Sequence, residues 1–394
     1  MSQTLHWKRH RFVWDFLYYC YGPWLRLRYN YRPKKYVVQG PALIVSNHCT
    51  DFDPIFLGLT IRSFSYYVAS GHMLNNPRKK FFSKLVRWGA GPIGRMKGDV
   101  GGDTALGTLR RLKKGFNVII FPEGNRTFNG ETADIVESTA KLARVSGAKL
   151  VTHRFRGGYL TCPRWGAPNY RRGLVTGEVV REFSPEELKA MTVDEIADVI
   201  RTDIRENAYE TQAKWKIRYK GRNLAKNIER VLCICPSCRR LGSLESKGNT
   251  FSCRSCGLTG EYTELGYLEG KGLPFHTILD WDRWQARELQ KRADTAGDAC
   301  IAEDTDMELT ELTEDYDVKP IARGRLAIFR DRLECAGLTI PFSDVTGMGV
   351  NSGQTLILTA RGRHFNIQSN RVRNLRKYLT LYHAVTAPDK LMSI

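Results

Sequence analysis

Between residues 36 and 185, short apolar segments alternate with amphipathic helical patterns. Four of these segments have the length and composition of buried strands: YVVQGPALIVSN, SFSYYVAS, FNVIIF and AKLVTHRF. Runs with helical periodicity lie between them, among them TALGTLRRLKKG and TADIVESTAKLARVSG. Strands that alternate with helices are joined by crossover connections, which leave neighbouring strands parallel. The sequence therefore predicts an α/β fold with a mostly parallel sheet.

The chain as a whole divides into segments of different composition. With 394 residues it is long enough for several hydrophobic cores. Near the end of the α/β region, Ser184 and Thr192 are predicted to be the N-caps of two helices. The predicted order is an interfacial amphipathic helical segment (1–30), the α/β domain with C-terminal helices and a basic linker (31–230), a cysteine module (231–265), a helix and acidic linker (266–317), and a small β-rich domain (318–394). The last domain combines several antiparallel strands with a closing helix, so we expect a small β-barrel of pleckstrin-homology type.

The charge of the chain is strongly positive. There are 61 Lys and Arg residues against 41 Asp and Glu residues, which gives a formal net charge of +20. A hydrophobic content of 42% together with 26% charged residues is typical of a folded protein and excludes a disordered one. The positive field favours an anionic partner: nucleic acid, an anionic membrane surface or a phosphorylated substrate.

The N-terminal segment predicts a helix that lies on a membrane surface. Aromatic side chains stand beside basic ones in residues 7–30: Trp7, Phe12, Trp14, Phe16 and Tyr18 beside Lys8, Arg9 and Arg11. Asp15 and Pro23 interrupt the most apolar stretch, which is too short for the roughly 20 apolar residues of a membrane span. The first residues also lack the apolar core of a signal peptide. We therefore expect a cytoplasmic protein, peripheral on the inner face of the membrane; an ordinary core helix is the alternative.

The loop sequence SNHCTDFDP, residues 46–54, places His48 five residues before Asp53. This spacing has two interpretations, a catalytic pair or a helix start in which Asp53 is the N-cap and Pro54 the first helical residue. The spacing alone does not decide between them, because His10 and Asp15 repeat it. The catalytic interpretation needs support from other parts of the chain.

That support comes from the positions of other polar segments relative to the predicted strands. SNH follows the apolar strand ALIV, and FPEGNRTFNG follows FNVIIF. A third segment, GPIGRMKGD, contributes Arg95 and Lys97. Open α/β sheets form their ligand sites at the carboxyl ends of their strands. We therefore expect one crevice that contains His48, Asp53 and basic side chains, whereas His10 and Asp15 follow no strand and are interpreted as a basic surface and a helix face.

Three motifs in this order resemble the conserved blocks of the glycerolipid acyltransferase family. They are Asn47-His48-x4-Asp53, Gly91-Pro-Ile-Gly-Arg95 and Phe121-Pro-Glu-Gly-Asn-Arg126-Thr127. The resemblance covers about residues 30–185 and is closest to the 1-acylglycerol-3-phosphate (lysophosphatidate) acyltransferase type. It implies a membrane-associated enzyme of phospholipid synthesis, and it makes residues 31–230 an acyltransferase domain.

The resemblance also implies a role for each motif residue. Transfer of an acyl group from a thioester to a hydroxyl needs a base, and neutral imidazole suits this step near pH 7. His48 is the expected base, and Asp53 fixes its tautomer. The acceptor hydroxyl is itself the nucleophile, so no covalent enzyme intermediate is needed. The substrate-binding residues expected from the motifs are Asn47, Arg95, Lys97, Glu123, Gly124, Arg126 and Thr127, with both arginines on the acceptor's phosphate.

Two segments depart from the family pattern. Where the family has a proline-containing apolar strand, this chain has AKLVTHRFRGGYLTCPRW, with His153, Arg154 and Arg156. In the third motif Asn125 replaces the more common small hydroxyl residue. The donor, acyl-CoA or acyl carrier protein, and the head group of the lysophospholipid acceptor therefore stay open.

The cysteine module contains two C-x2-C pairs separated by 14 residues. Four thiolates with this spacing are typical of a zinc ribbon, so Cys235, Cys238, Cys253 and Cys256 are predicted to bind a structural zinc ion. The remaining cysteines are interpreted as free thiols, including Cys233.

A zinc ribbon on a basic chain also suggests another function, nucleic-acid binding without acyl transfer. The segment KWKIRYKGR alternates basic with aromatic or aliphatic residues, as single-strand binders do. The same segment suits an anionic membrane surface equally well. The three ordered motifs favour the membrane, so we expect no specific nucleic acid as a partner.

Overall fold

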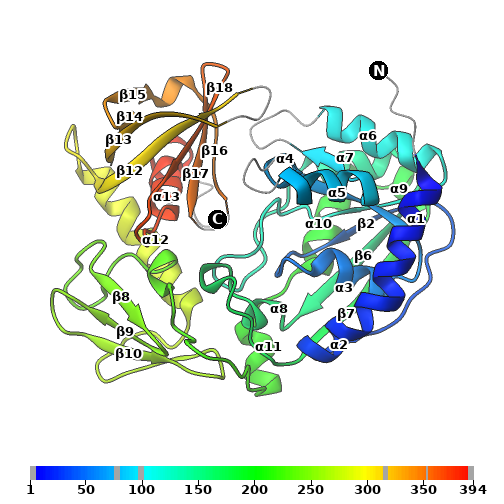
Figure 1. The fold of residues 1–394 in the computed structure, drawn as a ribbon, viewed down its shortest axis with the longest axis horizontal. Coiled ribbons are helices and arrows are strands. Elements are labelled where there is room, and N and C mark those ends of the chain that lie inside the picture. Colours follow the sequence, from blue (N-terminus) through cyan, green and yellow to red (C-terminus); the bar gives the residue numbers. More distant parts are fainter. Residues whose placement is uncertain (1–5, 75–79, 96–101, 314–317, 352–353, 389–394) are drawn as a thin grey trace. The chain divides into compact units, whose positions relative to one another are not determined.

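The computed structural model describes residues 6–74, 80–95, 102–313, 318–351 and 354–388 (Figure 1). Contacts within the chain divide it into two compact units. The first comprises Met1–Pro163 and Tyr170–Lys220, and the second comprises Arg164–Asn169 and Gly221–Ile394.

The first unit is built on a seven-stranded, mostly parallel sheet, as the sequence predicts. The strand order is β1-β7-β6-β2-β5-β3-β4, and β6–β7 is the antiparallel pair. The strands are β1 (Tyr31–Pro33), β2 (Ala42–Ser46), β3 (Ser65–Ser70), β4 (Ile93–Arg95), β5 (Asn117–Ile120), β6 (Lys149–Arg156) and β7 (Val175–Phe183). Because β2 and β5 are parallel neighbours, the loops that follow them emerge at the same edge of the sheet.

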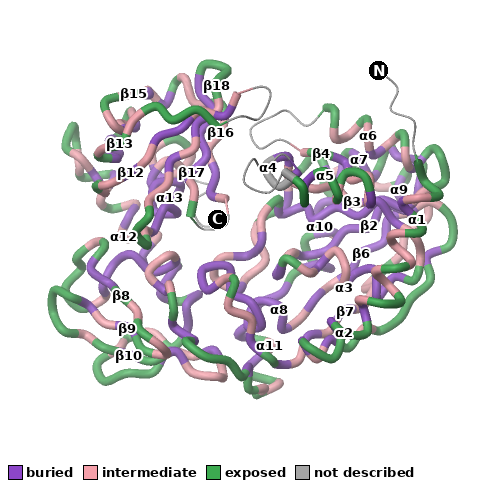
Figure 2. Tube along the Cα trace, in the orientation of Figure 1, coloured by how far each residue is buried: buried purple, intermediate pink, exposed green. Residues whose placement is uncertain are grey.

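Helices cover both faces of this sheet (Figure 1). Alternate residues of β2 point to opposite faces, and all five are buried (Figure 2). Leu43 and Val45 join a core with α6, α7 and α10, whereas Ala42 and Ile44 join a core with α2 and α3. The helices after the N-terminal segment are α3 (Asp53–Thr60), α4 (Gly71–Leu74), α5 (Lys80–Ala90), α6 (Gly102–Lys113), α7 (Ser138–Val145), α8 (Gly158–Thr161), α9 (Pro185–Ala190), α10 (Val193–Ile204) and α11 (Ala208–Trp215).

Local sequence signals set the ends of two of these helices. Ser184 accepts a hydrogen bond from the N–H of Glu187, whose carboxylate accepts from the N–H of Ser184. Thr192 and Glu195 form the same reciprocal pair at the start of α10. Each pair satisfies two backbone donors that the helix leaves unpaired. Both predicted N-caps are therefore confirmed.

The N-terminal segment forms one helical run of α1 (Trp7–Phe16), the π-helix η1 (Leu17–Tyr21) and α2 (Gly22–Tyr29). One side packs on the domain through Leu25 and Tyr29, while Phe12, Phe16 and Leu27 are exposed. The interpretation of His10 as part of a basic surface is wrong, because His10 is buried and hydrogen-bonds the Tyr66 hydroxyl. Among the described residues, no helix has both the length and the apolar character needed to cross a membrane.

The second unit contains two antiparallel sheets. The smaller one consists of β8 (Leu244–Lys247), β9 (Thr250–Cys253), β10 (Thr259–Tyr262) and β11 (Leu268–Glu269). Helix α12 (Ile278–Thr295) follows it. The larger sheet has the order β15-β14-β13-β12-β18-β17-β16 and is followed by α13 (Arg376–Thr386). Its strands are β12 (Ala302–Leu312), β13 (Val318–Ile328), β14 (Arg332–Cys335), β15 (Leu338–Pro341), β16 (Val345–Asn351), β17 (Thr355–Ala360) and β18 (Arg363–Gln368).

The prediction of an acidic linker within 266–317 is wrong, since β12 lies in the middle of the larger sheet. Met307 and Leu309 are buried in its core. Asp304 is ion-paired with Lys377 at 2.5 Å, which satisfies a largely buried carboxylate. Apolar residues such as Met307 and Leu309 alternate with the acidic residues of this segment, and an alternation of period two is the signal of a strand. The other predicted segment boundaries stay predictions.

Candidate active site

The loop after β2 brings His48 and Asp53 into contact. His48 Nδ1 lies 2.8 Å from Asp53 Oδ2. The Asp53 side chain is 1% exposed, whereas His48 is 22% exposed. The pair therefore has a buried carboxylate and an imidazole that solvent can reach.

The Asp53 carboxylate accepts hydrogen bonds from the loop that precedes it. Oδ2 accepts from the backbone N–H groups of Cys49 at 2.5 Å and Thr50 at 2.9 Å, and Oδ1 accepts from the Thr50 hydroxyl at 2.6 Å. The N-cap of α3 is Phe52, and Asp53 is the first helical residue, so the N-cap interpretation is wrong. Because Oδ2 accepts hydrogen bonds, His48 carries its proton on Nδ1, and the lone pair of Nε2 stays available as a base.

The plane and position of the imidazole are fixed by neighbouring groups. The ring of Phe121 stacks on His48 with a centroid distance of 4.4 Å and an interplanar angle of 21°. The backbone carbonyl of His48 accepts from the N–H of Thr127 at 2.9 Å. These contacts connect the loop after β2 to the loop after β5.

Asn47 connects the loop after β2 to strand β6 by hydrogen bonds. Its Oδ1 accepts from the N–H of Phe155 at 2.7 Å, and its Nδ2 donates to the Phe155 carbonyl at 3.0 Å. Ser46 Oγ lies 2.9 Å from His153 Nδ1, and burial lowers the pKa of His153 to about 3. Asn47 is buried, so this geometry assigns it to positioning the loop; its predicted contact with substrate stays a prediction.

Glu123 is also buried and faces the protein. One carboxylate oxygen accepts from the backbone N–H of His48 at 2.6 Å, and the other accepts from the N–H of Ala133 at 2.9 Å. Desolvation raises the pKa of Glu123 to about 8, although the two N–H groups oppose this shift. Glu123 therefore positions the backbone of His48, and its predicted contact with the glycerol of the acceptor stays a prediction.

Arg95 and the turn at Gly124 approach each other closely. Gly124 has a φ of +69°, and a Cβ atom at this position would lie 3.4 Å from Arg95 Nη1. Burial lowers the pKa of the Arg95 guanidinium. Glycine thus supplies the left-handed turn and leaves room for the arginine beside it. Lys97, the other predicted basic residue of this motif, lies outside the described residues.

Arg126 and Thr127 occupy the turn after Glu123. Arg126 is 9% exposed, and its Nη1 lies 3.3 Å from Asp51 Oδ2. The Thr127 hydroxyl donates to the Glu131 carbonyl at 2.6 Å and accepts from the Gly130 N–H at 3.1 Å. Thr127 therefore holds the turn that carries Arg126.

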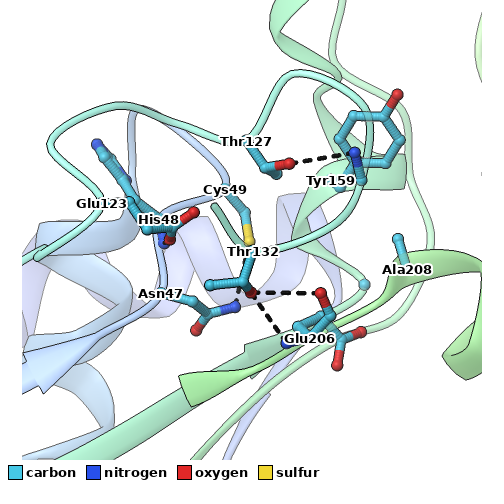
Figure 3. Close-up of a pocket in the computed structure, with 11 residues that line it drawn as sticks. Asn47, His48, Cys49, Glu123, Thr127, Thr132, Tyr159, Glu206 and Ala208 are labelled. Carbon is cyan, nitrogen blue, oxygen red and sulfur yellow. Dashed lines mark hydrogen bonds between the residues drawn. The ribbon is translucent and has the colours of Figure 1, made fainter. Parts of the chain in front are cut away.

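A small pocket lies beside the loop after β2. Figure 3 shows side chains that line it. Thr132 is hydrogen-bonded to the backbone of Glu206 on one side of the pocket (Figure 3). Burial raises the pKa of Glu206 to about 7. The lining residues are Asn47, His48, Cys49, Glu123, Thr127, Gly130, Thr132, Gly157, Tyr159, Glu206 and Ala208.

Sequence reasoning missed three residues that contact this site. Thr50 and Phe121 lie inside the recognised motifs but were given no role, and a hydroxyl three residues before a buried aspartate is a detectable signal. Tyr170 donates to Asp51 Oδ2 at 3.3 Å from 119 residues away, and no local pattern predicts that contact.

In the segment that departs from the family pattern, Arg156 Nη1 donates to Glu178 at 2.5 Å. The additional charge of Arg156 is thus paired within the domain.

The four predicted metal ligands form a second cluster, in the other unit. The sulfur atoms of Cys235, Cys238, Cys253 and Cys256 all lie within 4.8 Å of one another. Cys235 and Cys256 are 3.6 Å apart, and Cys238 and Cys253 are 3.7 Å apart. A tetrahedral zinc site with Zn–S distances of about 2.3 Å has sulfur atoms about 3.8 Å apart, so the cluster fits this ion. Cys233 instead hydrogen-bonds Gln285.

A match to a known protein family supports an acyltransferase assignment for the first unit. Residues 28–156 match the protein family described as Acyltransferase, and this segment contains His48, Asp53, Arg95 and Arg126. No curated protein matches the chain in sequence. Among solved structures, the chain is similar to the 1-acyl-sn-glycerophosphate (LPA) acyltransferase PlsC from Thermotoga maritima, with 17% identity and a TM-score of 0.39. That similarity covers 54% of this chain and 86% of the other.

The raised pKa of Glu123 predicts that the first unit loses stability as pH rises. Between about pH 4.5 and 8, folded Glu123 keeps a proton that the unfolded chain releases, so the free energy of unfolding falls through this window. Glutamine does not titrate, so we expect the free energy of unfolding of Glu123→Gln to fall less over this pH range than that of the wild type, by an amount on the order of a few kcal/mol. The measurement is urea unfolding of both proteins at several pH values. Glu137→Gln, at an exposed position, is the control, and parallel curves for wild type and Glu123→Gln would contradict the prediction.

Proposed function

We propose that this chain is a membrane-associated acyltransferase of phospholipid synthesis. It transfers a fatty acyl group from acyl-CoA or acyl carrier protein to the hydroxyl of a lysophospholipid, and the best candidate acceptor is 1-acylglycerol-3-phosphate. The observation that carries the proposal is the 2.8 Å contact between His48 and the buried Asp53, inside the segment that matches the acyltransferase family.

The geometry of His48 suits general-base catalysis. Nε2 takes the proton of the acceptor hydroxyl as the hydroxyl oxygen attacks the thioester carbonyl. Asp53 stabilises the imidazolium that forms. The tetrahedral intermediate then breaks its C–S bond, and the leaving thiolate receives the proton from His48. The products are an ester and a free thiol, and the enzyme returns to its starting state.

Arg95 and Arg126 are the proposed ligands of the acceptor's phosphate. Arg95 is the last residue of β4 and Arg126 lies in the loop after β5, so both are at the same edge of the parallel sheet as His48. A guanidinium can donate two parallel hydrogen bonds to a phosphate, which fixes the position of the head group as well as its charge. A fixed head group places the acceptor hydroxyl for attack.

An exposed aromatic face supports attachment to a membrane surface. Phe12 and Phe16 of α1 and Phe81, Phe82 and Trp88 of α5 are exposed, and together they define this aromatic face. The two helices are in contact, since Arg9 of α1 donates to the Trp88 carbonyl at 2.9 Å. Exposed aromatic side chains beside basic ones are typical of helices that lie in the interface of a bilayer. We propose that this aromatic face binds the inner face of an anionic membrane. It includes α5 as well as the predicted helical segment 7–30.

The second unit is proposed to contain a structural zinc ribbon and a domain of pleckstrin-homology type. Arg239 and Gly257, the residues after the two C-x2-C pairs, have positive φ values, and their N–H groups donate to the carbonyls of Cys235 and Cys253. Two matching turns and four sulfur ligands support a closed zinc site. Seven antiparallel strands followed by a helix support the proposed type of the C-terminal domain.

The first test of the function uses the two catalytic residues. We expect His48→Ala and Asp53→Asn each to lower kcat at least about 100-fold, because loss of a general base or its orienting partner removes factors of about 10² to 10⁴. The assay measures labelled product from a panel of lysophospholipids with acyl-CoA and acyl carrier protein as donors. Circular dichroism checks that the variants stay folded.

His276→Ala serves as the control because this histidine is exposed in the second unit. It should leave turnover unchanged. Equal activity of His48→Ala and wild type would refute the assignment. Sequence-selective nucleic-acid binding combined with no transfer to any lysophospholipid would favour the nucleic-acid alternative.

The second test addresses the membrane. Phe12→Ser combined with Phe81→Ser should lower the partition constant for anionic vesicles, measured by cosedimentation, at least about 100-fold, because each aromatic side chain that the membrane buries contributes about 1.5–3 kcal/mol. Binding should also weaken as salt rises, since screening reduces the attraction of basic residues. Val145→Ser, at an exposed position on α7, is the matched control. If the double variant sediments like wild type, the aromatic face does not bind membranes.

The third test addresses the metal. Purified protein should contain one zinc ion per chain, and Cys235→Ser or Cys253→Ser should lose it and make the ribbon sensitive to protease, because such modules take most of their folding free energy from the metal. Cys20→Ser, an exposed cysteine outside the cluster, should keep the zinc. Elemental analysis and limited proteolysis measure both effects. Immediate, reversible loss of turnover on chelation without unfolding would instead identify a catalytic metal.

A further inference from the structure

The arginine proposed to bind the acceptor's phosphate already has an anionic partner in the protein. Asp51 lies between His48 and Asp53 in the chain, and its Oδ2 is 3.3 Å from Arg126 Nη1. Asp51 is 60% exposed, whereas Arg126 is 9% exposed. The exposed member of the pair is therefore the carboxylate, and the guanidinium is nearly buried.

The contacts of Asp51 are weak compared with those of other ion pairs in the same unit. Its oxygen lies 3.3 Å from both Arg126 and the Tyr170 hydroxyl. By contrast, Arg181 forms bonds of 2.6 to 2.9 Å with both oxygens of the buried Asp203. Charge-assisted hydrogen bonds are normally about 2.7–2.9 Å long. Asp51 thus neutralises Arg126 with a long bond and from an exposed position, which makes its carboxylate easy to displace.

Two requirements explain such an arrangement. A nearly buried guanidinium without a counter-ion is strongly destabilised, so the site without acceptor needs a negative charge near Arg126. The same charge repels an incoming anion, because like charges about 4 Å apart interact appreciably even near a protein surface. An acceptor's anionic group that binds Arg126 at Nη1 must take the place of the carboxylate.

We propose that Asp51 is a specificity-determining residue that acts as an internal competitor for Arg126. Its carboxylate occupies the anion position in the site without acceptor, and the acceptor's phosphate displaces it toward solvent. An anionic head group can bind only while Asp51 is away from Arg126. The apparent affinity for every such head group is therefore the intrinsic affinity multiplied by the fraction of time that Arg126 is not held by Asp51. A lysolipid without an anionic group gains nothing from Arg126, so Asp51 sets how strongly the enzyme depends on head-group charge. This inference rests on the proposed function for the identity of the acceptor, and on the Arg126–Asp51 contact for the site.

The test removes the charge of Asp51 and keeps the shape of its side chain. Asp51→Asn should lower the KM for lysophosphatidate about five- to tenfold and leave kcat within about twofold, because the change affects binding and not the chemical step. The KM for a monoacylglycerol, which has no phosphate, should stay the same. Calorimetric binding of glycerol 3-phosphate gives a readout independent of turnover, and it should strengthen by the same factor.

Two further proteins separate competition from general charge effects. Asp198→Asn makes the same change in net charge at an exposed Asp–Arg pair on α10 and should alter neither KM nor binding. In an Arg126→Ala background, Asp51→Asn should bring no gain, because the two residues act on one position. A gain that persists without Arg126, or a higher or unchanged KM in Asp51→Asn, would overturn the inference.

The same experiments distinguish this inference from the proposed function. If the wild-type protein transfers no acyl group to any lysolipid, the function is wrong. Tighter binding of glycerol 3-phosphate by Asp51→Asn in that case would still support Asp51 as a competitor at an anion site. Active enzyme with equal phosphate binding in both proteins would refute the competitor and leave the acyltransferase assignment in place.

Discussion

The buried carboxylate of Asp53 is the interaction on which the candidate active site depends. A carboxylate with almost no exposure is stable only when hydrogen bonds replace its hydration. Asp53 accepts from His48 Nδ1, from the N–H groups of Cys49 and Thr50, and from the Thr50 hydroxyl. All these donors come from residues 48–50, so the loop must close around the carboxylate to satisfy it. That closure directs the lone pair of Nε2 away from Asp53, where an acceptor hydroxyl can reach it.

The order of strands in the sheet explains how Glu123, 75 residues after His48 in the chain, can position the loop that carries the imidazole. Strand β2 lies between β5 and β6, and both pairs are parallel, so three loops begin at nearby points of one edge. Glu123, after β5, accepts from the His48 N–H, and Asn47 binds the backbone of Phe155 in β6. The loop that carries the base is thus attached to both neighbouring strands. Such attachment favours a geometry that exists before substrate binds, which is how electrostatic catalysis avoids reorganisation.

The sequence predicted those features whose signals are local. Strand–helix alternation gave the mostly parallel sheet, the sequence SPEE gave the N-cap at Ser184, and the C-x2-C spacing gave four sulfur atoms that lie together. Failures arose where tertiary contacts decide. The acidic residues of β12 looked like a solvated linker because the partner of Asp304, Lys377, is 73 residues away. The Asp51–Tyr170 contact and the inward direction of Glu123 depend in the same way on distant segments, and no single stretch of sequence encodes them.

The catalytic residues and the proposed phosphate-binding arginine differ in how strongly the protein's own groups hold them. His48 and Asp53 have short hydrogen bonds and a stacked ring, and Asn47 and Glu123 fix the backbone around them. Arg126, in contrast, is neutralised by an exposed carboxylate at 3.3 Å. Rearrangement on binding is therefore concentrated at the arginine, where exchanging one anion for another changes little of the surrounding structure. A scaffold arranged in this way can change its acceptor through residues such as Asp51 and keep its base, because Asp51 contacts Arg126 and Tyr170, whereas His48 is held by Asp53 and Phe121.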